Sequence, residues 1–245
     1  MKVIILAAGL GKRMRELAIS TPKPMLNVKN GKNLLEYKMD ILPTECTEVI
    51  LIVGYLGQVI RDYFGQKYNN KYRHMNIKYV EAEVMGTGYC VWKAQHLLNE
   101  GEKFIVMCGD DLYSKSDLEK CLSEHHDNKI DEVEHKPMFT ALTYITNKPT
   151  SGGKIILDER DNILDIVEGS HDAGIMIATG LYVLTLEVFK VPLVKIPNRE
   201  EYGLPQTVMQ LKHKGIRVVK ATNWYQVTSP DDLEIEMKDI EKLYI

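Results

Sequence analysis

Two short stretches near the N-terminus, Leu6-Ala7-Ala8-Gly9-Leu10-Gly11-Lys12-Arg13-Met14 and Pro22-Lys23-Pro24-Met25-Leu26, decide how this chain is interpreted. The apolar run of residues 3–6 predicts a buried strand that leads directly into the glycine turn of the first stretch. Glycines let backbone N–H groups approach an anion, and Lys12 and Arg13 supply positive charge beside it. Strand, glycine loop and cations together predict a phosphate site.

Two better-known phosphate loops do not fit this stretch. A Walker A loop is G-x-x-x-x-G-K-[ST], but here Arg13 follows Gly11-Lys12, and the residue five positions before Gly11 is Leu6. The dinucleotide fingerprint needs a third glycine where this chain has Met14. Two glycines alone would indicate an ordinary turn, but Arg13 and the Pro-Lys-Pro of residues 22–24 favour a phosphate loop.

The pattern L-A-A-G-x-G-x-R-M followed by P-K-P-M-L resembles the opening of the sugar-phosphate nucleotidyltransferases, the pyrophosphorylases that make nucleotide sugars. The glucose-1-phosphate thymidylyltransferases are of this type. The resemblance implies an α/β fold, with a Rossmann-like, mixed and mainly parallel sheet and helices on both faces, in a single domain over residues 1–245. It also implies a Mg²⁺-dependent enzyme that joins a nucleoside triphosphate to a sugar 1-phosphate and releases pyrophosphate.

Composition narrows the class of protein. The 245 residues are 44% hydrophobic and 27% charged, with a net charge of -3, which argues against a broad nucleic-acid-binding surface. No apolar run approaches the roughly 18 residues of a membrane helix, and no signal-peptide pattern precedes Lys12. The four cysteines form no C-x-x-C pair, which predicts reduced thiols in a cytoplasmic protein. A homo-oligomer is compatible with these features.

Apolar runs in the first half alternate with helical patterns, which predicts a parallel sheet covered on both faces. The expected strands are residues 3–6, 48–53, 76–81 and 104–108, and the expected helices are 33–42, 56–64 and 89–98. In the second half we expect strands at 138–145, 154–157, 163–167, 175–184 and 216–220, and helices at 201–214 and 229–243.

Three local features of the second half refine this pattern. Asp161-Asn162 predicts the turn of a hairpin, and Ser229 with Pro230 predicts a capped helix start. The polar segment 124–136 contains His125, His126 and His135. These histidines lack the fixed spacing of a ligand set, so we interpret the segment as a helix end and a loop.

The resemblance assigns the nucleotide side of the site. It implies that Leu6, Ala8, Gly9 and Gly11 bind the nucleotide, that Arg13 grips the triphosphate, and that Lys23 lies near the α-phosphate. Asp110, just beyond the strand at 104–108, is the expected Mg²⁺ ligand, with Asp111 as the alternative. We expect Arg13, Lys23 and Asp110 to be the catalytic residues.

The segment Glu81-Ala82-Glu83-Val84-Met85-Gly86-Thr87-Gly88 resembles the family's base-reading Q-x-E-P-x-G-T-A. Gly86 and Thr87 are retained as expected nucleotide-binding residues, but Glu81 replaces the glutamine. A carboxylate only accepts hydrogen bonds, and guanine and cytosine offer donors where uracil and thymine offer flanking carbonyls. We therefore expect GTP, or next CTP, to be preferred over UTP and dTTP.

The sugar side of the resemblance is less complete. The implied sugar-phosphate residues are Gly153, Glu168, Thr179, Arg199 and Glu201. The chain departs from the family at Gly169, where a lysine is usual, and at Gln226, where a second metal-binding acid is usual. We expect Gln226 to help hold the metal through its amide oxygen.

Two other functions remain open at this point. One is a cytidylyltransferase that acts on a non-sugar phosphate such as phosphocholine, because the sugar half departs most from the family. The other is a regulator that binds nucleotide sugars without turnover. Gly169 and Gln226 favour this regulator, whereas Arg13, Lys23 and Asp110 oppose it.

Overall fold

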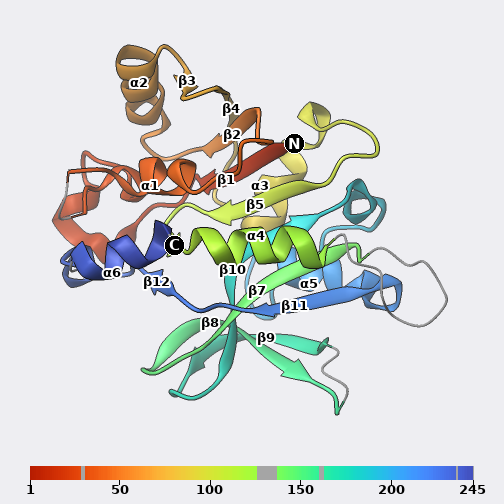
Figure 1. Ribbon diagram of the computed structural model, residues 1–245. Helices are drawn as coiled ribbons and strands as arrows, with labels where there is room; N and C mark the ends of the chain where they lie inside the picture. Colours follow the sequence, from red (N-terminus) through yellow and green to blue (C-terminus); the bar gives the residue numbers. More distant parts are fainter. Residues whose placement is uncertain (29–30, 126–136, 160–162, 236, 245) are drawn as a thin grey trace.

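This computed structural model describes residues 1–245 except 29–30, 126–136, 160–162, 236 and 245 (Figure 1). In the part described, ten strands form one large sheet. Their bounds are β1 (Lys2–Ala7), β2 (Glu48–Val53), β3 (Lys71–Tyr72), β4 (Met75–Glu81), β5 (Phe104–Cys108), β7 (Phe139–Ile145), β8 (Thr150–Leu157), β9 (Ile163–His171), β10 (Met176–Leu184) and β11 (Ile216–Lys220). A separate short ladder joins β6 (Asp111–Tyr113) to β12 (Trp224–Gln226).

The strand order is β11-β7-β10-β5-β1-β2-β4-β3, and β8 joins β9 to the sheet through β10. Strands β4, β2, β1 and β5 are mutually parallel, so their carboxyl ends meet at one edge. Strand β10 runs antiparallel between β5 and β7, while β11 is parallel to β7. The expected mixed sheet is therefore confirmed.

Helices cover both faces of this sheet (Figure 1). The α-helices are α1 (Leu34–Asp40), α2 (Gly57–Tyr68), α3 (Thr87–Lys93), α4 (Lys115–Glu124), α5 (Leu204–Val208) and α6 (Met237–Glu241). The 3₁₀-helices are η1 (Lys12–Ala18), η2 (Lys23–Met25), η3 (Gln95–Leu97), η4 (Leu186–Lys190), η5 (Met209–Lys214), η6 (Pro230–Leu233) and η7 (Lys242–Tyr244).

Alternation along β1 shows how two cores arise from one strand. Val3 and Ile5 belong to a core that contains buried residues of α1, α2 and α4. Ile4 belongs to the core on the opposite face, with buried residues of α3 and α5. Successive side chains of a strand point to opposite faces, so a continuous apolar run fills both.

The strands predicted at 48–53, 104–108 and 216–220 agree with β2, β5 and β11 at both ends. The other predicted strands are present with shifted ends. The expected hairpin is confirmed as far as it is described, because β8 pairs antiparallel with β9. Its turn at Asp161-Asn162 lies outside the described residues.

Four predicted helices are wrong in extent, and the one expected at 56–64 is α2, which continues to Tyr68. The helix expected at 201–214 begins only at Leu204, because Tyr202 and Gly203 donate their backbone N–H groups to Met85 and Val194 and stay extended. The one expected at 89–98 is α3 followed by η3, and the one at 229–243 is divided into η6, α6 and η7. Glu234, with φ -82° and ψ 32°, leaves the helical conformation after η6.

The helix end expected at the start of segment 124–136 is confirmed by α4, but the extent of this helix was not predicted, although its signals are present. Ser114 stands at the N-cap and Asp117 lies in the first turn. Leu118 and Cys121, three residues apart, are fully buried on one face. The β6–β12 ladder was also missed, because three-residue strands carry too little pattern to detect.

Two features of the composition have structural counterparts. Cys46, Cys90, Cys108 and Cys121 are free thiols. Within the residues described, every helix is too short or too polar to cross a lipid bilayer.

Asp232 is expected to stabilise the C-terminal segment in a pH-dependent way. Burial alone would raise its pKa, but its carboxylate accepts four hydrogen bonds of 2.8–2.9 Å from the backbone and hydroxyl groups of Thr228 and Ser229, which lower the pKa to about 2. A lowered carboxyl pKa stabilises the fold above the unfolded pKa, and this contribution is lost as pH falls toward 2. Asp232→Asn should cost about 1–2 kcal/mol of unfolding free energy at pH 7 and little at pH 2, measured by urea unfolding.

Candidate active site

The glycine loop follows β1 at the edge where the parallel strands end. Gly11 has φ +61°, a left-handed conformation that suits glycine, and it caps η1. A Cβ added at Gly11 would lie only 3.1 Å from the Cβ of Lys23. Around Gly9 nothing lies within 4 Å of such a Cβ, so the loop backbone is open to a ligand there. The local sequence thus brings the loop and Lys23 together.

Asp110 follows β5 and lies beside the glycine loop. Gly109 donates its N–H to the Leu6 carbonyl at 2.9 Å, and a Cβ at Gly109 would lie 2.3 Å from that oxygen. This close approach holds Asp110 beside the glycine loop. Lys23 Nζ lies 2.8 Å from Asp110 Oδ2, and Lys23 is only 7% exposed. The flanking prolines fix the φ of the lysine's neighbours and help to hold it there.

The two adjacent carboxyl groups have pKa values shifted in opposite directions. Burial by itself would raise the pKa of Asp110, but the ammonium groups of Lys23 and Lys38 outweigh it and lower that pKa. Burial and the negative charge of Asp110 raise the pKa of Asp111 well above its ordinary value. Asp110 is therefore the more readily ionised member of the pair, and Asp111 the more readily protonated one.

Asp110 is also the best donor for a metal ion. Among the described residues, one group of acidic, thiol or imidazole side chains has its ligand atoms close enough to share an ion: Cys108, Asp110 and Asp111. Burial raises the pKa of Cys108 well above its usual value, so this group stays a thiol. Mg²⁺ prefers oxygen ligands, and an ionised carboxylate beside open space fits it.

A cleft of about 540 Å³ contains ten of the residues assigned from the sequence. They are Leu6, Ala8, Gly9, Gly11, Arg13, Lys23, Gly86, Thr87, Asp110 and Glu201. Arg13 is exposed, so its guanidinium is accessible to a ligand at the cleft. Residues from β1, α3, β5 and the segment before α5 thus meet in one hollow.

Glu81 is not among the residues that line this cleft. Its side chain is 81% exposed, and its carboxylate pairs with Arg61 Nη2 of α2 at 3.0 Å. Contact between Glu81 and a nucleobase therefore stays a prediction.

The sugar-side residues are also placed outside the lining, except for Glu201. Thr179 is 1% exposed and donates its hydroxyl to the Leu142 carbonyl, so this hydroxyl is used within the sheet. Glu168 accepts a long hydrogen bond of 3.5 Å from Gln206 and packs over Gly153. Arg199 is exposed on the segment before α5. Sugar binding by these four residues stays a prediction.

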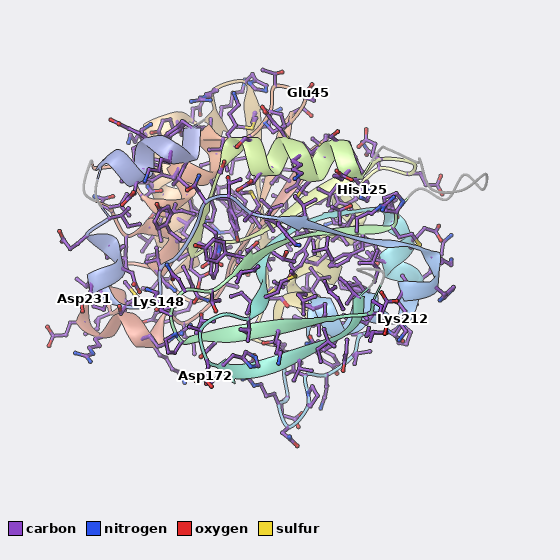
Figure 2. All side chains as sticks on the ribbon, turned by 60° about the horizontal axis from the view of Figure 1, so that its bottom comes forward. Glu45, His125, Lys148, Asp172, Lys212 and Asp231 are labelled. Atoms are coloured by element: carbon purple, nitrogen blue, oxygen red, sulfur yellow. The ribbon has the colours of Figure 1, made fainter. Side chains whose placement is uncertain are left out.

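Gln226 lies on β12, opposite Asp111 of β6. Its amide oxygen accepts a hydrogen bond of 2.8 Å from Thr150, and its amide nitrogen donates to the Ser151 carbonyl at 3.3 Å. It lines a second hollow of about 450 Å³ near Lys148 and Asp231, which lie on the same side of the molecule in Figure 2. Its proposed role as a metal ligand stays a prediction.

The described part of the histidine-containing segment lies at the end of α4. His125, labelled in Figure 2, is buried, and its Nδ1 lies 2.9 Å from the hydroxyl of Thr140 on β7. His126 and His135 lie outside the described residues.

The cleft also contains Lys12, which was expected to supply positive charge there, and six residues that were not predicted from the sequence: Leu10, Pro24, Val84, Cys90, Cys108 and Gly109. Most of them are immediate neighbours of assigned residues, so proximity in sequence could have found them. Cys90 follows Gly86 by four positions, the spacing of one helical turn, which was the available signal. Lys38 on α1, whose ammonium group helps to lower the pKa of Asp110, had no signal in the sequence that could have identified it. It is 1% exposed, and burial lowers its own pKa to about 8.

Comparisons with known proteins agree with this geometry. Residues 2–242 match a family model described as nucleotidyl transferase. The bifunctional protein GlmU of Methanocaldococcus jannaschii is 29% identical over 238 residues, which cover 95% of this chain and 52% of GlmU, so this chain spans about half of that relative.

Two further proteins match over nearly their whole length. The D-glycero-alpha-D-manno-heptose 1-phosphate guanylyltransferase of Aneurinibacillus thermoaerophilus is 29% identical over 247 residues, covering 98% of this chain and 99% of the relative. The crystal structure of HddC from Yersinia pseudotuberculosis superimposes with a TM-score of 0.70 at 22% identity, covering 98% of both chains. This structural likeness shows a shared fold.

Proposed function

The chain belongs to the nucleotidyl transferase family, and on this premise we propose that it joins a nucleoside triphosphate to a sugar 1-phosphate in a Mg²⁺-dependent reaction. The acceptor's phosphate oxygen forms a bond to the α-phosphorus, the bond from that phosphorus to the bridging oxygen breaks, and pyrophosphate leaves. We propose that residues 1–245 act as one nucleotidyltransferase domain. We further propose that the protein is cytoplasmic, because its four cysteines are free thiols.

The observation that carries this proposal is the Lys23–Asp110 pair beside the open glycine loop. Two anionic substrates must approach each other, and negative charge builds up at the transferred phosphorus. Lys23 would lie near the α-phosphate and exposed Arg13 would bind the outer phosphates. Asp110 would hold Mg²⁺, which supplies further positive charge when bound.

On the acceptor side, we propose that Arg199 binds the phosphate of the sugar. Gly169 takes the place of the usual lysine, so Arg199 would be the main counter-charge, and a guanidinium binds phosphate bidentately. Glu201, which lines the cleft, and Glu168 would accept hydrogen bonds from sugar hydroxyls. Gly153 and Thr179 would shape the backbone around the sugar.

Pyrophosphate release tests this function directly. Purified protein should release pyrophosphate with at least one combination of GTP, CTP, UTP or dTTP with a sugar 1-phosphate, and only when Mg²⁺ is present. Release with phosphocholine but with no sugar phosphate would favour the cytidylyltransferase. Triphosphate binding without release from any acceptor would favour the non-catalytic regulator.

Among the triphosphates, we expect GTP to give the highest kcat/KM. The relative that matches over its full length is named a guanylyltransferase, and Glu81 can accept hydrogen bonds from the donors of guanine. The expected margin over UTP and dTTP is about 1–3 kcal/mol, the size of one good base contact. Glu81→Gln should narrow this margin, because an amide both donates and accepts.

The control for this variant is Arg61→Gln, which removes the present partner of Glu81 and keeps its carboxylate. This variant should retain the preference for GTP. A wild-type preference for UTP or dTTP would refute the assignment of Glu81.

A further inference from the structure

One wall of the cleft is built from two segments that lie more than a hundred residues apart. Tyr202 donates its N–H to the Met85 carbonyl at 2.7 Å, and Gly88 donates its N–H to the Tyr202 carbonyl at 2.9 Å. The hydroxyl of Thr87 accepts the N–H of Leu204 at 3.0 Å. Three hydrogen bonds therefore tie the turn before α3 to the start of α5.

Glycines allow this close contact. A Cβ at Gly86, which has φ +96°, would lie 2.3 Å from the carbonyl oxygen of Tyr202 and 2.6 Å from its nitrogen. A Cβ at Gly88 would lie 3.1 Å from the carbonyl carbon of Gly203. A side chain at either position would push the two segments apart. The Gly-Thr-Gly sequence thus builds a docking surface for the other segment.

The segment that docks on this surface is a compact loop, and it contains residues that we expect to bind the sugar 1-phosphate. Gly203 donates its N–H to the Val194 carbonyl at 3.0 Å, and Ile196 donates to the Glu201 carbonyl at 2.8 Å, which closes residues 194–203 into a hairpin-like loop. Arg199 lies at its tip, where its N–H bonds back to Ile196. The loop is therefore rooted at residues 202–204, directly on the start of α3, where Thr87 is the first helical residue.

The Thr87 hydroxyl has a specific partner at this root. Leu204 is fully buried and is the first residue of α5, so its N–H has no acceptor within the helix. A buried amide left without an acceptor is costly. The side chain of Leu204 packs into the core shared with α3, so α5 would remain docked without this hydrogen bond, while the loop before it would lose an anchor.

We propose that Thr87 is a positioning residue for the second substrate: its hydroxyl fixes the root of loop 194–203 and so places Glu201 and Arg199 to hold the sugar 1-phosphate beside the bound triphosphate. This inference rests on the proposed function and changes one part of it. The family resemblance assigns Thr87 to the nucleotide, whereas the hydrogen bond to Leu204 assigns its main effect to the second substrate.

The test is the pair of variants Thr87→Val and Thr87→Ser. Valine keeps the shape of threonine and removes the acceptor oxygen, and serine keeps the oxygen. We expect Thr87→Val to raise the KM for the sugar 1-phosphate about tenfold, which corresponds to about 1.4 kcal/mol, and to change the KM for the triphosphate by less than about twofold. Thr87→Ser should stay close to the wild type. Arg199→Ala should shift the same KM in the same direction.

A second measurement does not depend on turnover. Hydrogen–deuterium exchange of a peptide that covers residues 194–204 should be faster in Thr87→Val than in the wild type, and not in Thr87→Ser. If the wild type releases no pyrophosphate with any substrate while this exchange difference is found, the proposed function fails and the anchoring role stands.

Three results would overturn the inference. An equal rise of both KM values in Thr87→Val would assign Thr87 to the nucleotide. Equal damage from serine and valine would show that the hydroxyl oxygen is not the relevant group. Unchanged exchange and unchanged KM values would show that the hydrogen bond to Leu204 does not position the loop.

Discussion

Replacement of Asp110 by asparagine is expected to lower kcat by about 10²-fold or more, the usual loss when one preorganised electrostatic contact is removed. Asparagine has nearly the same shape as aspartate but carries no charge. It would weaken both the hold on Mg²⁺ and the 2.8 Å ion pair that fixes Lys23. The measurement is the rate of pyrophosphate release against Mg²⁺ concentration, and the variant should also need more Mg²⁺.

Asp111→Asn is the matched control for this prediction. Asp111 is 6% exposed, and burial and the negative charge of Asp110 raise its pKa well above the ordinary value, so its replacement by a neutral amide should change the charge of the site less than the same replacement at Asp110. Its kcat should fall far less than that of Asp110→Asn. If Asp110→Asn keeps nearly normal activity while Asp111→Asn loses it, the ligand role passes to Asp111.

The second large effect is expected from Lys23→Met. Methionine fills the space of the buried lysine stem but leaves Asp110 without its partner and the triphosphate without a counter-charge. We expect kcat to fall by about 10²-fold, because a charge aimed at the developing phosphate charge is lost. Circular dichroism and thermal unfolding of the variant would show that the loss of activity does not come from unfolding.

The pH dependence of kcat gives this variant a signature of its own. Lys23 is the main group that lowers the pKa of Asp110 against the effect of burial. Its removal lets that pKa rise, so the acid side of the pH–rate profile should move to higher pH. Arg15→Met is the control, since Arg15 is an exposed cation of η1 that does not line the cleft. An unmoved acid limb in Lys23→Met, or an equal loss in Arg15→Met, would contradict the assignment.

The core of the fold and the meeting of the glycine loop, Lys23 and Asp110 in one cleft could be predicted because their signals are local. Strands β2 and β5 match their predicted bounds since central parallel strands are buried on both faces and appear as unbroken apolar runs. The glycines and cations of the loop lie between Gly9 and Arg13, and Asp110 comes two positions after the last residue of β5. The cleft brings these predicted groups together.

The bounds of the helices in the second half were harder to predict, because contacts with distant residues determine where these helices begin. The helical pattern from Glu201 onward ignores the hydrogen bond from Tyr202 to Met85, which holds the chain extended up to Leu204. The segment after Ser229 begins as predicted, yet it breaks at Glu234. Sequence periodicity reports which residues can share a face and not which backbone groups find partners elsewhere.

The sequence by itself therefore determined the fold class, the family and the charged groups that meet at the cleft, since residue types at close spacing fix these. Only the tertiary structure decided which polar side chains are still available. Glu81 is paired with Arg61, Gln226 with Thr150, and Thr87 with Leu204. The partner lies 20 positions away along the chain for Glu81, 76 for Gln226 and 117 for Thr87. The residue type determines which hydrogen bonds a side chain can make. The tertiary structure determines which partner it makes them with.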